Sequence, residues 1–343
     1  MKVPILSIII PMYNCGAFIE KTVNNLLSSN VDSDFFEIIL IDDGSIDNTK
    51  FVCEQTFKNN SNVHYFYKSN GGIASSRNFG IAVAKGKYLF FHDHDDIFAK
   101  ENFDKIIKIL NSSQSNLLFF ESCTITNNVE KPLCIVNEKY DNKQLSKDDI
   151  KSLFETLFFI QNKGNIINKV GQIWTLFIKR DFVIKHKIEF VIRCDYEDDF
   201  TFILECLLKD DCTISTHKIN TYKWVIRRES ESHCLKYDPN FMDRVSNYLS
   251  YLDEIIGNSK FSSLKKRCIS NIEWRKTRDY LLLFGRGTNV DKSFSNFIGK
   301  CKKYHIRERM IQKTTFKKSK NQRLLCFFFK FKLYRLAFRA IIK

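Results

Sequence analysis

The fold of this chain is decided by the stretch Tyr88-Leu-Phe-Phe-His-Asp-His-Asp-Asp-Ile-Phe98. Its apolar start, residues 88–91, is too short for a helix and predicts a buried strand. Three carboxylates follow this run at once: Asp93, Asp95 and Asp96. They fall at the carboxyl edge of the predicted strand, which is the edge where open α/β sheets bind their ligands.

The three carboxylates repel one another unless a cation lies between them. Oxygen ligands at this density favour Mg²⁺ or Mn²⁺ over Zn²⁺, so the cluster predicts a divalent metal site. The alternative is that Asp96 caps a helix that begins near Ala99. His94 is either a further ligand through its imidazole or a side chain that packs outward.

Strand–helix alternation precedes this stretch. Apolar runs predict strands at Leu6–Ile10, Phe36–Ile41 and Val63–Tyr67, and apolar residues at helical spacing predict helices at 17–28 and 73–84. The alternation predicts an α/β fold with a doubly wound, mostly parallel sheet of Rossmann-like type.

Polar residues also follow the first two strands. Pro11, Tyr13 and Asn14 come after the first, and Asp42-Asp43-Gly44-Ser45 comes after the second. In a parallel sheet these ends share one edge with the acidic cluster. The alternative is that Asp42, Asp43 and Asp47 only cap the following helix, although this explains adjacent aspartates poorly.

The net charge of +15 is concentrated at the carboxyl end. Eleven of the 54 Lys and Arg lie between Arg309 and Lys343, where there is no Asp or Glu. The rest of the chain is close to neutral, which argues against a nucleic-acid binder.

The eleven cysteines are odd in number and form no C-x-x-C pair. Because residues 1–10 lack the features of a signal peptide, we expect reduced thiols in a cytoplasmic protein. No apolar run reaches the length of about 18 residues that predicts a membrane span. Neither G-x-G-x-x-G after the first strand nor a P-loop is present, so an anion would be neutralised by a metal and side chains.

Four motifs carry a resemblance to a known family: Ser7-Ile-Ile-Ile-Pro-Met-Tyr-Asn14, Ile41-Asp-Asp-Gly-Ser45, Asn70-Gly-Gly-Ile-Ala-Ser-Ser-Arg-Asn-Phe-Gly80 and Phe91-His-Asp-His-Asp-Asp96. In order and spacing they resemble the family 2 glycosyltransferases. These are inverting nucleotide-sugar enzymes of the GT-A fold that serve bacterial-type glycan synthesis. The resemblance implies a nucleotide-sugar-binding half at 1–110, an acceptor-binding half at 111–235 and a helical C-terminal region at 236–343.

The resemblance also implies roles for single residues. Pro11 and Tyr13 would line the pocket for the base of the nucleotide, and Asp43 would accept the imide hydrogen of a uracil. Arg77 would reach the base or the diphosphate. Of the two acids in the D-x-D motif, Asp93 would face the ribose and Asp95 would bind the metal, Mn²⁺ or Mg²⁺.

A second acidic run, Asp195-Tyr-Glu-Asp-Asp-Phe-Thr-Phe202, resembles the family's E-D-x-x-F box. Alignment on Phe202 makes Asp199 the general base that removes the proton of the acceptor hydroxyl. Asp198 stays open as an alternative base, and capping of the following helix is the structural alternative. Further along, Arg227, Arg228 and His233 are candidates to contact the diphosphate or the metal.

The implied enzyme is a hexosyl- or N-acetylhexosaminyltransferase that moves a sugar from a UDP-sugar to a hydroxyl of a glycan or lipid-linked acceptor. Cell-surface polysaccharide or lipopolysaccharide synthesis is the expected setting. The alternatives are an inactive nucleotide-binding module of the same fold and a sugar nucleotidyltransferase. The latter needs a basic phosphate loop near residue 15, and Asn14-Cys-Gly-Ala-Phe18 has no Lys or Arg.

The tail pattern predicts one amphipathic helix, with Lys332, Arg335, Arg339 and Lys343 on a single face and aromatic and aliphatic residues around the rest. Such helices lie in membrane interfaces. We therefore expect a cytoplasmic protein that is peripherally attached to the inner face of the cell membrane. Packing of the tail on the protein's own body and nucleic-acid binding are the alternatives.

Overall fold

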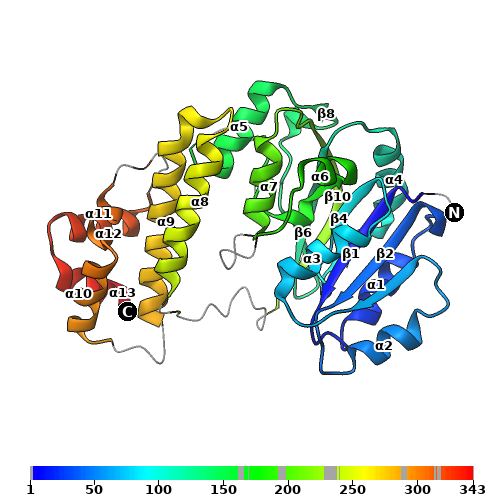
Figure 1. Cartoon of the computed structure of the whole chain (residues 1–343), viewed down its shortest axis with the longest axis horizontal. Helices are drawn as coiled ribbons and strands as arrows, with labels where there is room; N and C mark the ends of the chain where they lie inside the picture. The colour runs from blue at the N-terminus through cyan, green and yellow to red at the C-terminus, as the bar shows by residue number, and fades with distance from the viewer. Residues whose placement is uncertain are drawn as a thin grey trace. The chain divides into compact units, whose positions relative to one another are not determined.

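The structure is a computed structural model, and it describes residues 3–160, 166–168, 170–191, 198–227, 238, 240–286, 292–312, 314 and 318–342. The chain forms two compact units (Figure 1). Met1–Leu153 and Ile166–Arg227 make the first unit, and Phe154–Asn165 and Arg228–Lys343 make the second.

The first unit is built on one ten-stranded sheet. Its strands are β1 (Leu6–Met12), β2 (Phe36–Asp42), β3 (Val63–Tyr67), β4 (Tyr88–Phe91), β5 (Ile97–Phe98), β6 (Leu117–Thr126), β7 (Val129–Pro132), β8 (Lys143–Gln144), β9 (Leu176–Lys179) and β10 (Ile214–Val225). The main order is β3-β2-β1-β4-β9-β6-β10-β5, with β7 beside β6 and β8 beside β10.

Strands β3, β2, β1 and β4 are parallel, as the sequence predicts. Strand β9 lies antiparallel between β4 and β6, while β6 and β10 are parallel to each other. The sheet is therefore mixed, and the predicted doubly wound α/β fold is confirmed.

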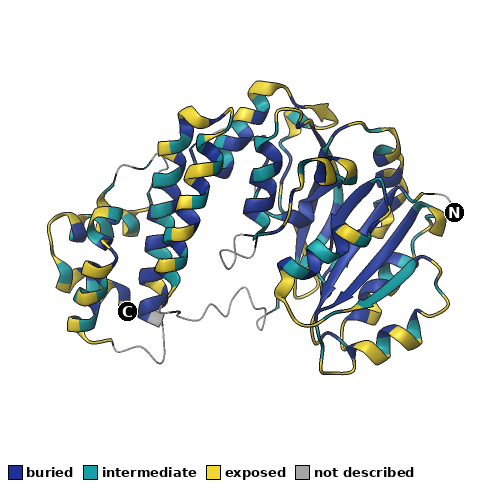
Figure 2. Ribbon diagram, viewed as in Figure 1, coloured by how far each residue is buried: buried dark blue, intermediate teal, exposed yellow. Residues whose placement is uncertain are grey.

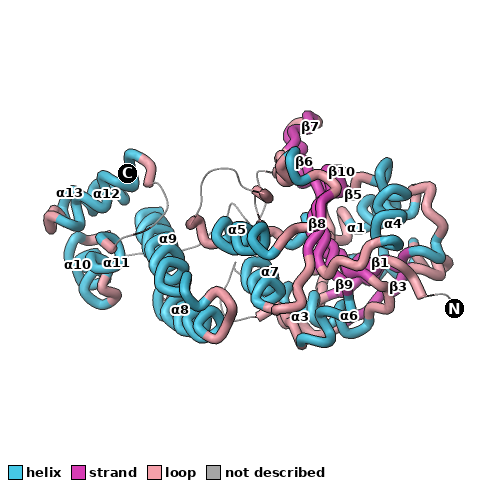
Figure 3. Tube along the Cα trace, turned by 90° about the horizontal axis from the view of Figure 1, so that it is seen from above, coloured by secondary structure: helices cyan, strands magenta, loops and turns pink. Residues whose placement is uncertain are grey.

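Helices cover both faces of this sheet, with α4 and α7 on opposite sides of it in Figure 3. The helices of the first unit are α1 (Ile19–Leu27), α2 (Thr49–Thr56), α3 (Gly72–Val83), α4 (Phe103–Ser112), α6 (Arg180–His186) and α7 (Asp198–Leu208). Helix α5 (Lys147–Leu157) crosses from the first unit into the second.

The central strands are buried along their whole length, which Figure 2 shows as dark blue ribbon. Aromatic rings pack on the faces of the sheet. Phe90 of β4 stacks on Phe177 of the neighbouring strand β9 with ring centroids 4.5 Å apart, and Phe91 of β4 contacts Phe202 of α7 with centroids 6.0 Å apart. Because the strand interiors are apolar, the polar groups of this sheet gather where the strands end.

The second unit is helical, as predicted for the C-terminal region. Its helices are α8 (Phe241–Gly257), α9 (Lys265–Arg286), α10 (Phe294–Lys303), α11 (Ile306–Ile311), α12 (Lys320–Lys330) and α13 (Tyr334–Ile342). The long helices α8 and α9 pack side by side (Figures 1 and 3). The buried indole of Trp274 on α9 donates a hydrogen bond to the carbonyl of Met310 at 3.1 Å.

The tail differs from the single helix that the sequence pattern predicts, and that prediction is wrong. Lys332 has a φ of 56° and lies in the turn between α12 and α13. Only Arg335 and Arg339 of the predicted basic face share helix α13, and Lys343 lies outside the described residues.

The turn lets both tail helices bury a side chain in the second unit. Phe329 of α12 and Ala337 and Ile341 of α13 are buried. Helix α13 approaches α9 so closely that a Cβ on Gly285 would lie 2.1 Å from the carbonyl oxygen of Ile341. Packing on the protein's own body, the alternative raised from the sequence, therefore accounts for one side of the tail.

None of the described helices combines the length and apolar character needed to cross a bilayer. The cysteines within the described ranges are all free thiols.

Helix α3 rests on β1 through Gly80, where an added Cβ would lie 2.4 Å from Cγ2 of the buried Ile9. We expect Gly80→Val to destabilise the first unit by about 1–3 kcal/mol, because the core has no room for the side chain. Hydrogen exchange of β1 peptides in urea measures this. Gly299→Val on α10, where no heavy atom lies within 4 Å of the added Cβ, is the control. Equal exchange of β1 in both variants would contradict the tight contact.

Candidate active site

The predicted site residues gather at the carboxyl edge of β1, β2 and β4. The loops after β1 and β2 are tied together at Asn14, whose amide donates to Ser45 Oγ at 2.8 Å. The side chain of Asn14 accepts from the amide of Ile46 at 2.9 Å. Asn14 adopts a φ of 50°, a conformation that asparagine tolerates better than most residues. These two hydrogen bonds hold the loop after β1, on which the neighbouring Tyr13 lies, against the loop after β2.

Asp43 is buried and held by three donors. Lys68 Nζ and the amide of Gly71, at 3.0 Å, both donate to Oδ1, and the amide of Gly72 donates to Oδ2 at 2.7 Å. Burial alone would raise the pKa of Asp43, but the Lys68 and glycine hydrogen bonds outweigh it and lower the pKa. The carboxylate is thus kept ionised, with an acceptor position left on Oδ2 for a further N–H donor.

Pro11 and Tyr13 lie at the end of β1, on either side of Met12, whose carbonyl accepts from the amide of Asp43 at 2.8 Å. Pro11 is buried in β1 and pairs in register with Ile41 of β2. Tyr13 is 48% exposed, so its ring is available to a planar ligand. Neighbouring Asp47 bonds to the amide of Thr49 at 3.0 Å, so capping explains Asp47 but not Asp43.

Arg77 of α3 lies buried among three carboxylates. Its Nη1 donates to Asp198 Oδ2 at 2.8 Å and to Asp199 Oδ1 at 2.6 Å. Its Nη2 lies 3.7 Å from Asp93 Oδ1, and the guanidinium is 5.1 Å from the Phe190 ring centroid. Burial opposes its charge, yet the three aspartates raise the pKa of Arg77. The cluster joins segments that the sequence keeps far apart.

Asp199 is the best placed candidate base. Its Oδ2 accepts from the amide of Ile173 at 3.2 Å, so each carboxylate oxygen has one fixed donor. Burial raises the pKa of Asp199 to about 6, with Asp198 and Asp93 adding to the rise and Arg77 opposing it. Both acids begin helix α7, but their side chains bind Arg77, so capping alone does not explain them.

Asp96 does not cap a helix, and that alternative is wrong. Its Oδ1 accepts from the amide of Val225 at 2.7 Å and its Oδ2 accepts from the Tyr222 hydroxyl. Burial, with help from Asp93, raises the pKa of Asp96 to about 7. The Tyr222 hydroxyl also lies 3.4 Å from Asp93 Oδ2, so β10 contacts two of the three acids that follow β4, Asp93 and Asp96.

Asp95 pairs with Arg227, which follows β10. The Arg227 guanidinium donates to the carboxylate and to the backbone carbonyl of Asp95, and it lies 5.2 Å from the Phe18 ring centroid. Both partners are about one third exposed. Of the basic candidates from the sequence, Arg227 thus reaches the cluster, while Arg228 and His233 lie outside the described residues.

The structure adds residues that the sequence analysis did not single out. Lys68 follows β3, the strand that pairs in parallel with β2. Its position just after a predicted strand places it at the same sheet edge as Asp43, and this could have identified it from the sequence. Tyr222 gave no local signal, because only the pairing of β10 with β5 brings it to the acids that follow β4. His92 lies buried beside Tyr222, and burial lowers the pKa of its imidazole to about 4, while His94 is partly exposed.

The described residues contain no set of three or more His, Cys, Asp or Glu side chains that could hold a metal ion alone. Asp93 and Asp95 nevertheless present hard oxygen donors with side-chain exposures of 36% and 31%. Magnesium-type sites often use one or two carboxylates together with substrate phosphates. The donor set fits that mode, with Arg227 now occupying the place of a cation beside Asp95.

These features define a class of protein: an α/β domain with a charged ligand site at the carboxyl ends of its parallel strands. Comparison with known proteins identifies the family. Residues 7–159 match the family model described as glycosyl transferase family 2, and this part of the chain belongs to that family. The family predicted from the four motifs is confirmed.

Two curated relatives show how the match is distributed. The uncharacterized glycosyltransferase MG060 of Mycoplasma genitalium is 39% identical over 120 residues, 34% of this chain and 40% of that protein. The minor teichoic acid biosynthesis protein GgaB of Bacillus subtilis is 28% identical over 112 residues, 32% of this chain and 12% of that protein. The chain therefore matches less than half the length of either relative.

A solved structure resembles the fold of the chain as a whole. The crystal structure of S. aureus TarS 1–349 in complex with UDP-GlcNAc has a TM-score of 0.63 and 16% sequence identity. The likeness covers 98% of this chain and 90% of that one. The predicted GT-A fold with C-terminal helices is thereby confirmed.

Removal of the buried guanidinium tests the carboxylate cluster. We expect Arg77→Met to lower the free energy of unfolding of the first unit by about 3–5 kcal/mol at pH 7.5, because buried carboxylates lose their partner. The loss should shrink towards pH 5. The pKa values of Asp93 and Asp199 are already raised by burial, and without Arg77 they lie further above their unfolded values, so the folded state binds more protons and gains stability as pH falls.

Lys108→Met is the matched control, since Lys108 pairs with Asp104 at 2.6 Å on the exposed side of α4. Its effect should stay below about 1 kcal/mol at both pH values. Urea unfolding followed by hydrogen exchange in β4 and α7 peptides measures both variants. A loss for Arg77→Met that is unchanged between pH 7.5 and 5 would contradict the electrostatic role.

Proposed function

We propose that the protein is an inverting glycosyltransferase that moves a sugar from a UDP-sugar to a hydroxyl of a glycan or lipid-linked acceptor. The observation that carries the proposal is the Asp199 carboxylate. It has two fixed donors, Arg77 and the Ile173 amide, and lies in one cluster with Asp93. A base next to the acids of a D-x-D motif is what a single displacement at a sugar carbon needs.

The donor pocket is proposed at the ends of β1 and β2. Tyr13 would face the base, Pro11 would shape the wall behind it, and Asp43 would accept the N–H of uracil at its open position on Oδ2. Asp93 would bind the ribose hydroxyls. The complex of TarS with UDP-GlcNAc supports a UDP-sugar as donor, because that protein shares the fold.

A divalent cation, Mn²⁺ or Mg²⁺, is proposed at Asp95, where it would neutralise charge on the departing diphosphate. Asp95 would supply a carboxylate oxygen, and the diphosphate would supply the others. Arg227 would leave Asp95 when the cation arrives, and its guanidinium would then be free to contact the diphosphate.

The proposed reaction is one displacement. An acceptor hydroxyl gives its proton to Asp199 as its oxygen forms a bond to the anomeric carbon. The bond from that carbon to the diphosphate oxygen breaks on the opposite face, and UDP leaves with the electron pair. Arg77 holds Asp199 in place, and the raised pKa of Asp199 makes its carboxylate a stronger base than an exposed aspartate.

We also propose that the protein acts in the cytoplasm at the inner face of the cell membrane, in cell-surface polysaccharide synthesis. The minor teichoic acid name of the relative GgaB supports a surface polymer as product. Exposed apolar side chains on the tail helices, among them Leu324, Phe327 and Leu336, support contact with a membrane surface.

Removal of the base tests the mechanism. We expect Asp199→Asn to reduce kcat by roughly 10²–10⁴-fold with donor affinity nearly unchanged, since the amide cannot accept the proton. For the wild type, kcat/KM should fall below pH about 6, where Asp199 becomes protonated. UDP release from several UDP-sugars with Mn²⁺ and a glycan acceptor measures both.

Asp198→Asn is the control, because it removes the charge of the neighbouring carboxylate that also binds Arg77. Full activity of Asp199→Asn, together with loss in Asp198→Asn, would move the base to Asp198. Retention of configuration in the product would contradict a single displacement. Absence of transfer with every donor, despite UDP binding, would favour an inactive nucleotide-binding module.

The metal assignment predicts opposite effects for the two partners of the Asp95 ion pair. Asp95→Ala should abolish Mn²⁺-dependent UDP binding. Arg227→Met should tighten Mn²⁺ binding without nucleotide by up to about fivefold, because a competing pair worth about 1 kcal/mol is removed. Titration calorimetry measures both. Equal UDP affinity of the wild type in Mn²⁺ and in EDTA would show that no metal acts at Asp95.

A further inference from the structure

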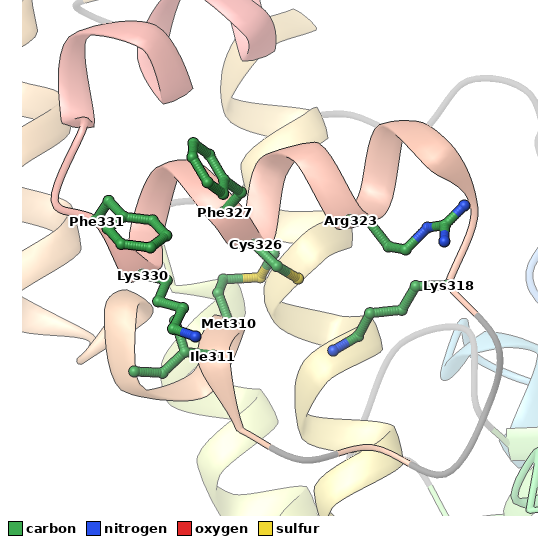
Figure 4. A pocket seen from close by; sticks show the side chains of 8 residues that line it. All are labelled: Met310, Ile311, Lys318, Arg323, Cys326, Phe327, Lys330 and Phe331. Atoms are coloured by element: carbon green, nitrogen blue, oxygen red, sulfur yellow. The ribbon is translucent and has the colours of Figure 1, made fainter.

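A pocket of about 260 Å³ lies between α11 and α12 in the second unit (Figure 4). Three cationic side chains line it, Lys318, Arg323 and Lys330, together with the apolar side chains of Ile311, Phe327 and Phe331. On α12 the lining residues follow the spacing i, i+3, i+4 and i+7 from Arg323, so they share one face of that helix, and Phe331 follows at its C-cap.

The cations of this pocket have no acidic partner within the described part of the chain. The segment from Arg309 to the C-terminus contains no Asp or Glu at all. Lys318 Nζ lies 4.9 Å from the Trp274 ring centroid, and Lys330 Nζ lies 5.7 Å from that of Phe331, so both contact aromatic faces instead. Three positive charges at one pocket attract an anion, and Arg and Lys side chains are suited to phosphate groups.

The apolar side of the pocket distinguishes a lipid from a soluble anion. Phe327 is 48% exposed and Phe331 is 55% exposed, with ring centroids 4.6 Å apart. A small soluble phosphate would leave these rings in water. Aromatic rings beside cations are typical of membrane interfaces, where the rings lie at the level of the headgroups.

The size of the pocket limits what enters it. Its volume of about 260 Å³ is slightly below the range of about 300–1,000 Å³ for small-ligand sites, which leaves room for a headgroup but not for acyl chains. The chains would remain outside, against Phe327 and Phe331.

We propose that this pocket binds the headgroup phosphate of an anionic phospholipid, with Phe327 and Phe331 inserted into the membrane interface. The proposal rests on the proposed attachment of the tail to the membrane and makes it specific. One pocket fixes the second unit to the bilayer, in place of the uniform basic helix face that the sequence pattern predicts.

The test compares two triple variants of the full chain that lose the same charge. Lys318→Gln, Arg323→Gln and Lys330→Gln remove the pocket cations. Lys320→Gln, Lys332→Gln and Arg339→Gln remove exposed tail cations that do not line the pocket. Co-sedimentation is measured with vesicles of phosphatidylcholine alone and with added phosphatidylglycerol, and circular dichroism checks the fold of each variant.

We expect the pocket triple to lose at least tenfold more affinity for phosphatidylglycerol vesicles than the control triple. Phe327→Ser with Phe331→Ser should weaken binding several-fold with all charges retained. Equal losses in the two triples would overturn the pocket while leaving membrane attachment in place. Failure of the wild type to pellet with anionic vesicles would overturn attachment and the pocket together.

A further arm separates a lipid from a soluble ligand. Glycerol phosphate at millimolar concentration should not release the wild-type protein from phosphatidylglycerol vesicles, because it lacks the chains that contact the two rings. Release, together with calorimetric binding of glycerol phosphate to the wild type but not to the pocket triple, would overturn the lipid assignment in favour of a soluble phosphate.

Discussion

The site in the first unit depends on one buried guanidinium. Asp93, Asp198 and Asp199 are partly buried and lie too close together to carry their charges without a cation, and Arg77 supplies it. The position of Arg77 follows from the packing of its helix. Gly80, one turn further along α3, lets the helix approach Ile9 of β1, so the absence of a side chain at Gly80 sets the depth of Arg77.

Strand β10 and the residues that follow it hold Asp95 and Asp96 in place. Tyr222 and the amide of Val225 hold Asp96, and Arg227 holds Asp95, so each acid after β4 has a donor from one strand and its end. The five aspartates of the site face two arginines, so the site keeps an excess of negative charge even before a ligand binds. The diphosphate of the proposed donor would add negative charge to this arrangement, so its binding would require a metal or the release of an arginine from its carboxylate. In that proposal, donor binding and rearrangement of Arg227 would be linked by charge.

The sequence predicts what depends on local pattern. Apolar runs followed by polar clusters located β1, β2 and β4, and the motifs identified the family. The contact between Arg77 and Asp199 was not predictable in this way, because it joins residues 122 positions apart. It depends on β9 entering the sheet antiparallel between β4 and β6, which no local spacing encodes. The prediction of a single tail helix was wrong for a related reason. The helical pattern of the tail continues through Lys332 and does not indicate the turn there, which the burial of Phe329 and Ile341 favours.

The two units use positive charge in opposite ways. In the first unit, Lys68, Arg77 and Arg227 each contact a carboxylate. Their charges therefore neutralise acids within the site and hold those side chains in place. In the described part of the tail, Lys318, Arg323 and Lys330 face no acid, and their field extends into solvent. Pairing of this kind suits a site that must position a base within a narrow range of pKa. Unbalanced charge beside exposed aromatic rings suits a surface that must attract an anionic partner. The uneven distribution of Lys and Arg along the chain thus fits the roles proposed for the two units.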